Sequence, residues 1–113
     1  MANLSPRMYR EFFWEVDCRL ASQFEWPIYH THSACAHILP VLADVPALKA
    51  IEVTLDPAPF GPPPLDLLPK FQLVQQAGKS LLLRGPLTRS ELETLLERLS
   101  PIGLAIRAGL LDS

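Results

Sequence analysis

Glycine, cysteine and positive charge are scarce in this sequence of 113 residues. Five glycines are present, and no glycine-rich loop follows any of the apolar runs. This argues against a nucleotide-binding sheet, which needs closely spaced glycines to admit a pyrophosphate. The formal net charge of -2 leaves no basic surface that would release counterions from nucleic acid or anionic lipid. We therefore expect no nucleic-acid partner.

Long hydrophobic runs are also absent. The longest apolar stretch, residues 38–48, is interrupted by Pro40, Asp44 and Pro46. A membrane-spanning helix needs about 18 or more consecutive apolar residues, so no membrane span is expected. Residues 1–10 lack the basic and then apolar pattern of a signal peptide.

The two cysteines, Cys18 and Cys35, are too few for a disulfide framework. Without a secretion signal they are expected to be reduced thiols, which predicts a cytoplasmic protein. Cys18 fits a small hydrophobic residue within a helix.

What the sequence does contain is a repeated change of hydrophobic period, with many of its twelve prolines at the boundaries. A single domain over residues 1–113 is expected. The predicted elements are a helix over 5–24, a strand over 28–32, a helix over 34–43, a strand over 50–55, a helix from about 65, a strand over 80–83, a helix from 88 and a strand over 104–108.

Local signals support the helices. Ser5 and Pro6 suit a helix start, and apolar residues then recur every four positions. Ser33 is a plausible N-cap, and Gly78 fits a left-handed helix end. That four-residue repeat comprises Met8, Phe12, Val16, Leu20 and Phe24.

The third predicted helix has Leu68, Phe71 and Val74 as its buried positions. Thr88 and Glu91 have the spacing of a capping box before the last helix. Four leucines, at positions 92, 95, 96 and 99, then mark one face of that helix.

The run from Ser80 to Leu83 is almost wholly apolar, which predicts a strand covered on both faces. Strands separated by single helices must run parallel, with right-handed crossovers. The order α-β-α-β-α-β-α-β fits either a small doubly wound sheet or half of a (β/α)8 barrel, the TIM barrel. Without a glycine-rich loop, the half-barrel is preferred.

Four segments resemble a known family. They are Leu4–Phe12, with the sequence LSPRMYREF; Pro27–Ser33, PIYHTHS; Val45–Val53, VPALKAIEV; and Gln75–Lys79, QQAGK. Together they are similar to the C-terminal half of the barrel in uroporphyrinogen decarboxylases and related corrinoid-dependent methyltransferases.

The resemblance implies a lyase that decarboxylates a tetrapyrrole in porphyrin biosynthesis, or a zinc-assisted methyl transfer between a donor and an acceptor. It also implies that the N-terminal strands, with the arginine-rich loop of the decarboxylases, are missing. The later cysteine that completes a zinc site in the methyltransferases has no counterpart after Cys35.

His30 and His32 are the candidate metal ligands. Alternation along a strand places both on one face, with Tyr29 and Thr31 opposite, near the end where barrels place their chemistry. Two imidazoles there could hold zinc, with Cys35 as a third ligand if it is not drawn into the following helix. The alternative is that both histidines make ordinary hydrogen bonds.

Asp56 and Arg84 are the candidate catalytic residues. Asp56 ends a strand and suits a general acid or base, although Asp-Pro also starts turns. Arg84, expected at the end of the third strand, suits a substrate carboxylate. Glu52 on the same face would need a partner, which Arg84 or Arg107 could supply.

Two hypotheses follow. In the first, the chain is an enzyme whose missing half-barrel comes from a second copy, which closes the barrel as a homodimer. In the second, it is a non-catalytic half-barrel fragment that exposes apolar surface and self-associates. A small-molecule-binding or metal-binding module is a third reading.

Overall fold

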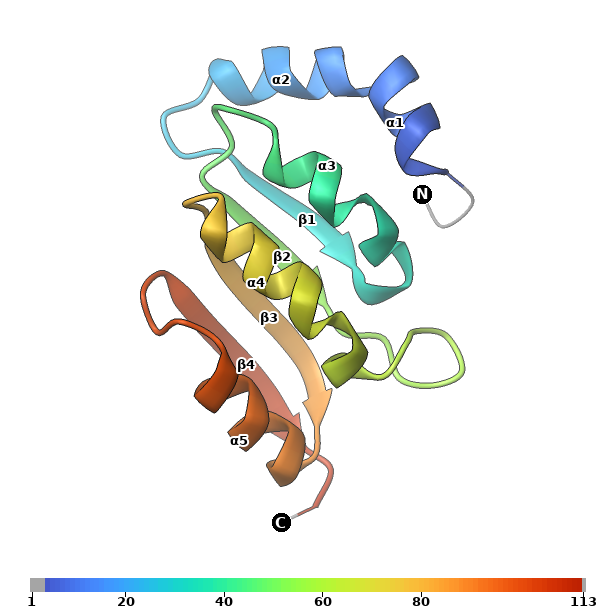
Figure 1. Cartoon of the computed structure of the whole chain (residues 1–113), viewed down its shortest axis with the longest axis vertical. Helices are drawn as coiled ribbons and strands as arrows, with labels where there is room; N and C mark the ends of the chain where they lie inside the picture. The colour runs from blue at the N-terminus through green and yellow to red at the C-terminus, as the bar shows by residue number, and fades with distance from the viewer. Residues whose placement is uncertain (1–3, 113) are drawn as a thin grey trace.

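The computed structural model describes residues 4–112, which form an α/β structure with one four-stranded parallel sheet (Figure 1). Its strands are β1 Ile28–His32, β2 Ala50–Thr54, β3 Ser80–Leu87 and β4 Leu104–Leu110. Its helices are α1 Pro6–Phe12, α2 Trp14–Ser22, α3 Leu39–Ala43, α4 Leu68–Gln76 and α5 Arg89–Arg98, with 3-10 turns η1 Ser33–Ile38 and η2 Pro64–Leu67.

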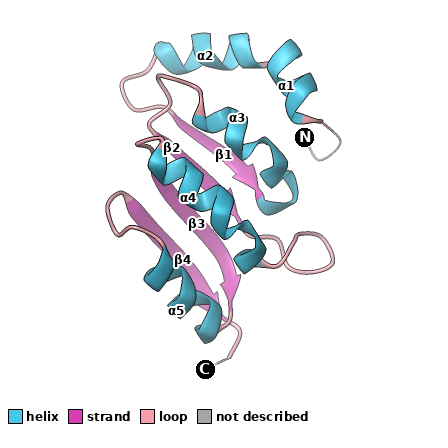
Figure 2. Cartoon of the chain, viewed as in Figure 1, coloured by secondary structure: helices cyan, strands magenta, loops and turns pink. Residues whose placement is uncertain are grey.

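The strands are hydrogen-bonded in the order β1-β2-β3-β4, which is their order in the sequence. Each strand is therefore hydrogen-bonded to the strand that follows it in the sequence, and all three pairs run parallel. Right-handed crossovers between sequential strands place their helices on one side, and Figure 2 shows α3, α4 and α5 together over one face. The shortest dimension of the molecule is 19 Å, consistent with a sheet and a single helical layer.

Alternation along the strands divides the sheet into a buried and an open face. Ile51, Val53, Leu81 and Leu83 point toward the helices and are at most 1% exposed. The residues between them point to the other side. We call that side the open face; its side chains are Ile28, His30, His32, Glu52, Thr54, Leu82, Arg84, Ala105 and Arg107.

The prediction that the third strand is covered on both faces is therefore wrong. Leu82 is only partly buried and Arg84 is exposed, because no helix of residues 4–112 lies over the open face. The strand is also longer than expected. It continues through Arg84 to Leu87, which is again fully buried.

The first predicted helix is divided into two at Phe13, whose backbone leaves the helical region. Ser5 caps it as expected, accepting a hydrogen bond from the Met8 N–H. The buried residues of α1 and α2 are Tyr9 and Ala21, with Trp14 and Cys18 packed against the core. The repeating apolar residues instead form an exposed stripe: Met8, Phe12, Val16, Leu20 and Phe24.

The second predicted helix is a 3-10 turn, η1, followed by the short helix α3. Ser33 does not cap it, and its hydroxyl accepts a hydrogen bond from the Asp56 N–H instead. The core under this segment is formed by Ile38, Leu39 and Leu42, which are fully buried.

The later helices agree with the sequence. Leu68, Phe71 and Val74 of α4 are buried, and Gly78 has the left-handed φ of +79° expected after a helix end. Thr88 and Glu91 form both hydrogen bonds of the capping box of α5. Of the four leucines, Leu95 and Leu99 are buried and Leu92 is partly buried, whereas Leu96 is exposed.

A buried lysine just before β3 forms hydrogen bonds with the loop between α3 and β2. The Lys79 ammonium donates hydrogen bonds to the carbonyls of Val45 and Leu48, at 2.7 and 2.9 Å. Burial lowers the pKa of this ammonium. Within the described residues, no helix is long and apolar enough to cross a bilayer.

Candidate functional site

The open face carries polar residues in rows that run across the strands. The strand register pairs His32 with Thr54, Thr54 with Arg84, and Arg84 with Arg107. Neighbouring strands lie about 4.8 Å apart, so this row of four side chains extends over about 14 Å. A second row consists of His30, Glu52, Leu82 and Ala105. As predicted, His30 and His32 lie on the same face of β1, and Tyr29 and Thr31 point to the opposite face.

His30 is held by a carboxylate from the next strand. Its Nδ1 lies 2.5 Å from Glu52 Oε1, and both side chains are partly exposed. The expectation that Arg84 or Arg107 would pair with Glu52 is therefore wrong. The register places Glu52 directly opposite His30, and Arg84 lies one row further along the sheet.

His32 has an equivalent arrangement with Asp56, which lies two residues after the carboxyl end of β2. His32 Nδ1 lies 2.9 Å from Asp56 Oδ1, and Asp56 Oδ2 accepts a hydrogen bond from the Ala34 N–H at 3.4 Å. The buried Ser33 hydroxyl accepts from the Asp56 N–H at 2.7 Å. Asp56 is thus fixed through both its backbone and its carboxylate.

A proline-rich loop, residues 57–63, follows Asp56 and packs tightly against this site. A Cβ atom at Gly61 would lie 2.6 Å from the Asp56 carbonyl oxygen and 2.6 Å from the Ser33 hydroxyl. Only glycine permits so close an approach without displacing the backbone. Gly61 therefore helps to fix the position of the Ser33–Asp56 hydrogen bond.

The two arginines of the open face lie side by side. Arg84 is in the middle of β3, and not at its end as predicted, with Arg107 as its register partner on β4. Both are exposed, and within residues 4–112 neither guanidinium forms an ion pair with a carboxylate. Two cations thus face solvent on adjacent strands.

The histidines alone do not complete a metal centre. Their rings lie edge to face with centroids 5.2 Å apart, and each Nδ1 is occupied by a carboxylate, which leaves the two Nε2 atoms for ligation. A carboxylate behind a ligating histidine is common at zinc sites. However, zinc sites in proteins use three or four protein ligands. No group of three suitable side chains occurs within the described part of the chain.

The remaining candidate ligands have other surroundings. Cys35 is buried in η1, because the turn after β1 carries it into the core. The ring of His37, the third histidine of the chain, makes a hydrogen bond with the Leu4 carbonyl. Both residues therefore have structural roles in this fold.

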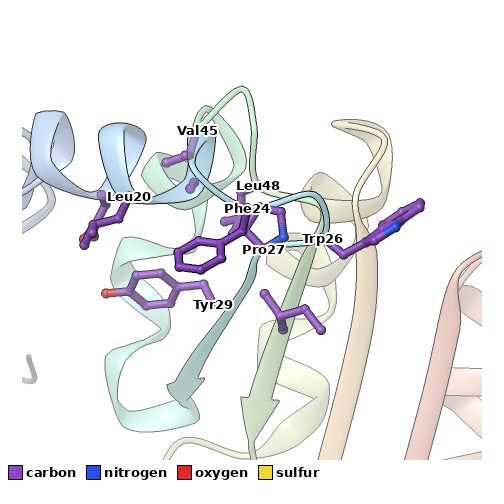
Figure 3. Close-up of a pocket in the computed structure, with 10 residues that line it drawn as sticks. Leu20, Phe24, Trp26, Pro27, Tyr29, Val45 and Leu48 are labelled. Atoms are coloured by element: carbon purple, nitrogen blue, oxygen red, sulfur yellow. The ribbon is translucent and has the colours of Figure 1, made fainter.

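A separate apolar pocket of about 450 Å³ lies at the opposite end of β1 (Figure 3). It is lined by Leu20, Phe24, Pro27 and Tyr29, and Asp17 is its only charged residue. Parallel α/β folds place chemistry at the carboxyl ends of the strands, whereas this pocket is at the amino end. The open face is therefore the candidate functional site.

Burial perturbs the ionisable groups around this pocket. It raises the pKa of Tyr29 to about 12, with a further contribution from the Asp17 carboxylate. The pKa of Tyr9 is raised further, by burial and by the hydrogen bond that its hydroxyl donates to Asp17. Burial also raises the pKa of the Cys18 thiol, in agreement with its predicted packing role.

Three features of the site were not predicted from the sequence: the Ser33 hydrogen bond, the close approach of Gly61, and the pairing of Arg107 with Arg84. All three depend on strand register or on loop closure, which leave no local pattern in the sequence. The proline-rich character of the loop was the only available signal that it is stiff.

A comparison of the chain with models of protein families, with curated proteins and with solved structures found no match in any of the three. The fold and the side chains of the open face are the basis for the function proposed next.

Proposed function

We propose that the chain is the C-terminal half of a uroporphyrinogen-decarboxylase-like (β/α)8 barrel, whose open face acts on a tetrapyrrole or on a methyl-transfer substrate. One observation carries the proposal. The strands are parallel and sequential, all crossover helices lie on one face, and the uncovered face is polar. This is the arrangement of a barrel wall, with helices outside and the active site at the carboxyl ends of the strands.

The alternative architecture, a doubly wound sheet, fits less well. Such a sheet has helices on both faces and reverses its strand order at a switch point, where the ligand binds. Here the order does not reverse, and the open face has no covering layer. A half-barrel also accounts for the two edge strands, since β1 and β4 would each meet a strand of the missing half.

The missing half is supplied, in this proposal, by a second copy of the chain. Helices α1 and α2, which carry most of the exposed apolar stripe, lie beyond the β1 edge of the sheet (Figure 1). In a two-fold symmetric closed barrel, β1 would pair with β4 of the partner, and this helix pair would cover the junction. Five apolar side chains that now face water would then be buried.

The chemistry is assigned to residues of the open face. In decarboxylation, the carbon atom that loses carbon dioxide must gain a proton. In this proposal His32, oriented by its hydrogen bond with Asp56, donates or accepts that proton. Arg84 is placed to bind a substrate carboxylate. Because the two histidines alone do not meet the ligand requirement of zinc, no step of this proposal passes through a metal.

The first test is the mass of the purified chain in solution, measured by light scattering on a sizing column. A dimer is expected, and Phe12→Ser or Leu20→Ser in the stripe should convert it to a monomer. Phe60→Ser is the matched control, because Phe60 is also exposed but lies in the proline-rich loop. A uniform monomer would remove the enzyme proposal and favour the non-catalytic fragment.

The second test is catalytic. Decarboxylation of a porphyrinogen should fall by about 100-fold or more in Asp56→Asn, the usual contribution of acid–base catalysis. Asp66→Asn is the control, since Asp66 is an exposed carboxylate in η2 and is not one of the open-face residues. Equal activity of both variants would exclude Asp56 from the reaction.

A further inference from the structure

The apolar pocket at the amino end of β1 has the size of a small-molecule site. Its volume of about 450 Å³ lies within the range of about 300–1,000 Å³ that is typical of ligand pockets in proteins. Helix α2 forms one wall, and the loop after α2, the first residues of β1 and the loop between α3 and β2 form the others (Figure 3). Segments from distant parts of the sequence therefore converge on this pocket.

The lining of the pocket is apolar and part of it faces solvent. Val45 and Leu48 are buried, whereas Leu20 and Phe24 are 50% and 64% exposed. A ligand with an apolar body would remove these exposed side chains from water, which is favourable. Leu20 and Phe24 also belong to the exposed stripe. Because each is only partly exposed, one side of it can line the pocket while the other side remains part of the stripe.

Asp17, the one charged residue of this lining, has no cationic partner. Its Oδ2 accepts a hydrogen bond from the Tyr9 hydroxyl, which is a neutral donor. Arg10 and Arg19 form ion pairs with other carboxylates, and within residues 4–112 no salt bridge includes Asp17. The first turn of α2 supplies only a partial positive charge. A partly buried carboxylate is costly without an opposite charge, which a ligand could provide.

The neighbouring acidic groups respond to the same negative charge. Burial and, after it, the Asp17 carboxylate raise the pKa of Tyr29 to about 12. Both causes also raise the pKa of the Cys18 thiol. The Tyr29 hydroxyl therefore stays protonated at neutral pH, and its oxygen can accept a hydrogen bond from a ligand N–H. The negative charge of the pocket favours a cation over an anion.

We propose that this pocket binds a small organic amine, with its ammonium group on Asp17 and its apolar body against Leu20 and Phe24. An ammonium donates charge-assisted hydrogen bonds to a carboxylate, and these are stronger than bonds between neutral groups. Aromatic rings also attract a cation held over their faces, and Phe24 and Tyr29 supply such rings in the lining. An organic anion would be repelled by Asp17, and a neutral ligand would leave its charge without a partner.

This inference concerns binding and not catalysis. The pocket is at the amino end of β1, whereas parallel α/β folds place their chemistry at the carboxyl ends of the strands. It goes beyond the function proposed for the open face and does not depend on it, because the two sites share no side chain that the proposed reaction uses.

The test is binding to the full chain, measured by titration calorimetry at low salt and neutral pH. The probes are 2-phenylethylamine, 2-phenylethanol and 3-phenylpropionate, which carry a positive, a neutral and a negative group on the same phenyl body. We expect the amine to bind most tightly and the carboxylate most weakly. Raising the salt concentration should weaken binding of the amine and leave that of the alcohol unchanged.

Asp17→Asn should lower the affinity for the amine about tenfold or more, as expected for the loss of a charged hydrogen-bonding partner, and leave that for the alcohol unchanged. The asparagine keeps a carbonyl oxygen for the Tyr9 hydroxyl, so the variant should fold, which its urea midpoint checks. Glu15→Gln is the matched control, because it removes the same charge from an exposed residue of α2 that does not line the pocket. It should retain wild-type affinity.

Phe24→Ser tests the apolar part of the pocket. It removes apolar surface and no charge, so it should weaken binding of the amine and of the alcohol by a similar factor. Phe12→Ser should bind the amine as the wild type does, because Phe12 belongs to the stripe but does not line the pocket. This variant separates the pocket from the proposed dimer.

Several results would overturn the proposal. They are no binding of the amine by the wild type, an order of affinities in which the amine is not first, and equal affinity of the wild type and Asp17→Asn for the amine. Loss of amine binding in Phe12→Ser would place the site between two copies of the chain and so overturn its assignment to a single chain. Since no turnover is measured, none of these results bears on the catalytic test of the open face.

Discussion

The Ser33 hydroxyl accepts a 2.7 Å hydrogen bond from the backbone N–H of Asp56, and so joins the carboxyl ends of β1 and β2. Ser33 is 2% exposed, so no solvent water replaces it. Ser33→Ala leaves the Asp56 N–H without its acceptor and should lower the free energy of unfolding by about 1–3 kcal/mol.

Urea unfolding followed by circular dichroism measures this loss. Ser22→Ala is the control, because Ser22 is exposed and its hydroxyl bonds only to the nearby Arg19 carbonyl. Its effect should stay within about 0.5 kcal/mol. Equal losses for both serines would show that the Ser33 contact is unimportant.

Gly61→Ala should displace the proline-rich loop. The added methyl group would lie 2.6 Å from the Asp56 carbonyl oxygen, a backbone atom that cannot rotate away. Overpacking of this kind costs about 1–3 kcal/mol, which thermal or urea unfolding detects. Gly109→Ala, where no atom lies within 4 Å of the new carbon, should be nearly neutral.

Leu81 and Leu82 provide a direct test of the one-sided sheet. Leu81 is fully buried under the helices, and Leu81→Ala should cost about 2–5 kcal/mol. Leu82 points to the open face, and Leu82→Ala should cost well under half of that loss in a monomer. Comparable losses of unfolding free energy in the two variants of a monomer would mean that Leu82 is as well packed as Leu81, and would contradict the one-sided sheet.

Stability should fall as the pH rises above about 10. An unfolded tyrosine releases its proton near pH 10, whereas the pKa of Tyr29 in the folded chain is about 12. Between these values the folded state binds more protons than the unfolded state, so increasing pH favours unfolding. Tyr9, whose pKa is also raised, acts in the same direction.

Urea unfolding at pH 9, 10 and 11 measures this slope, which should be smaller in Tyr29→Phe than in the wild type. Lys79 has the opposite effect, because its lowered pKa makes the unfolded state bind more protons below about pH 10.5. The wild type and Tyr29→Phe share that contribution, so their difference isolates Tyr29. Identical slopes would contradict the prediction.

Much of the fold was predictable because local rules determine it. The capping box at Thr88 and the left-handed Gly78 fix helix ends within a few residues, and the resulting order of elements requires parallel strands. Burial was harder to predict. The stripe from Met8 to Phe24 shows a shared helical face, but periodicity does not say which face is inside.

The candidate site was predictable only within single strands. Alternation correctly placed His30 and His32 together, since both belong to β1. The partners of these residues come from other strands, and strand register decided that Glu52 faces His30 and that Arg107 faces Arg84. Register depends on how whole strands pack against the helices, and no short pattern in the sequence records it.

The division between the two faces of the sheet has an evolutionary consequence. Leu81 and Leu83 hold the strand against the helices, while Leu82 and Arg84 between them contribute little to that core. Substitutions on the open face should therefore cost less stability than substitutions on the helical face. The same four strands could acquire a new ligand specificity, or lose an old one, through changes at every second position.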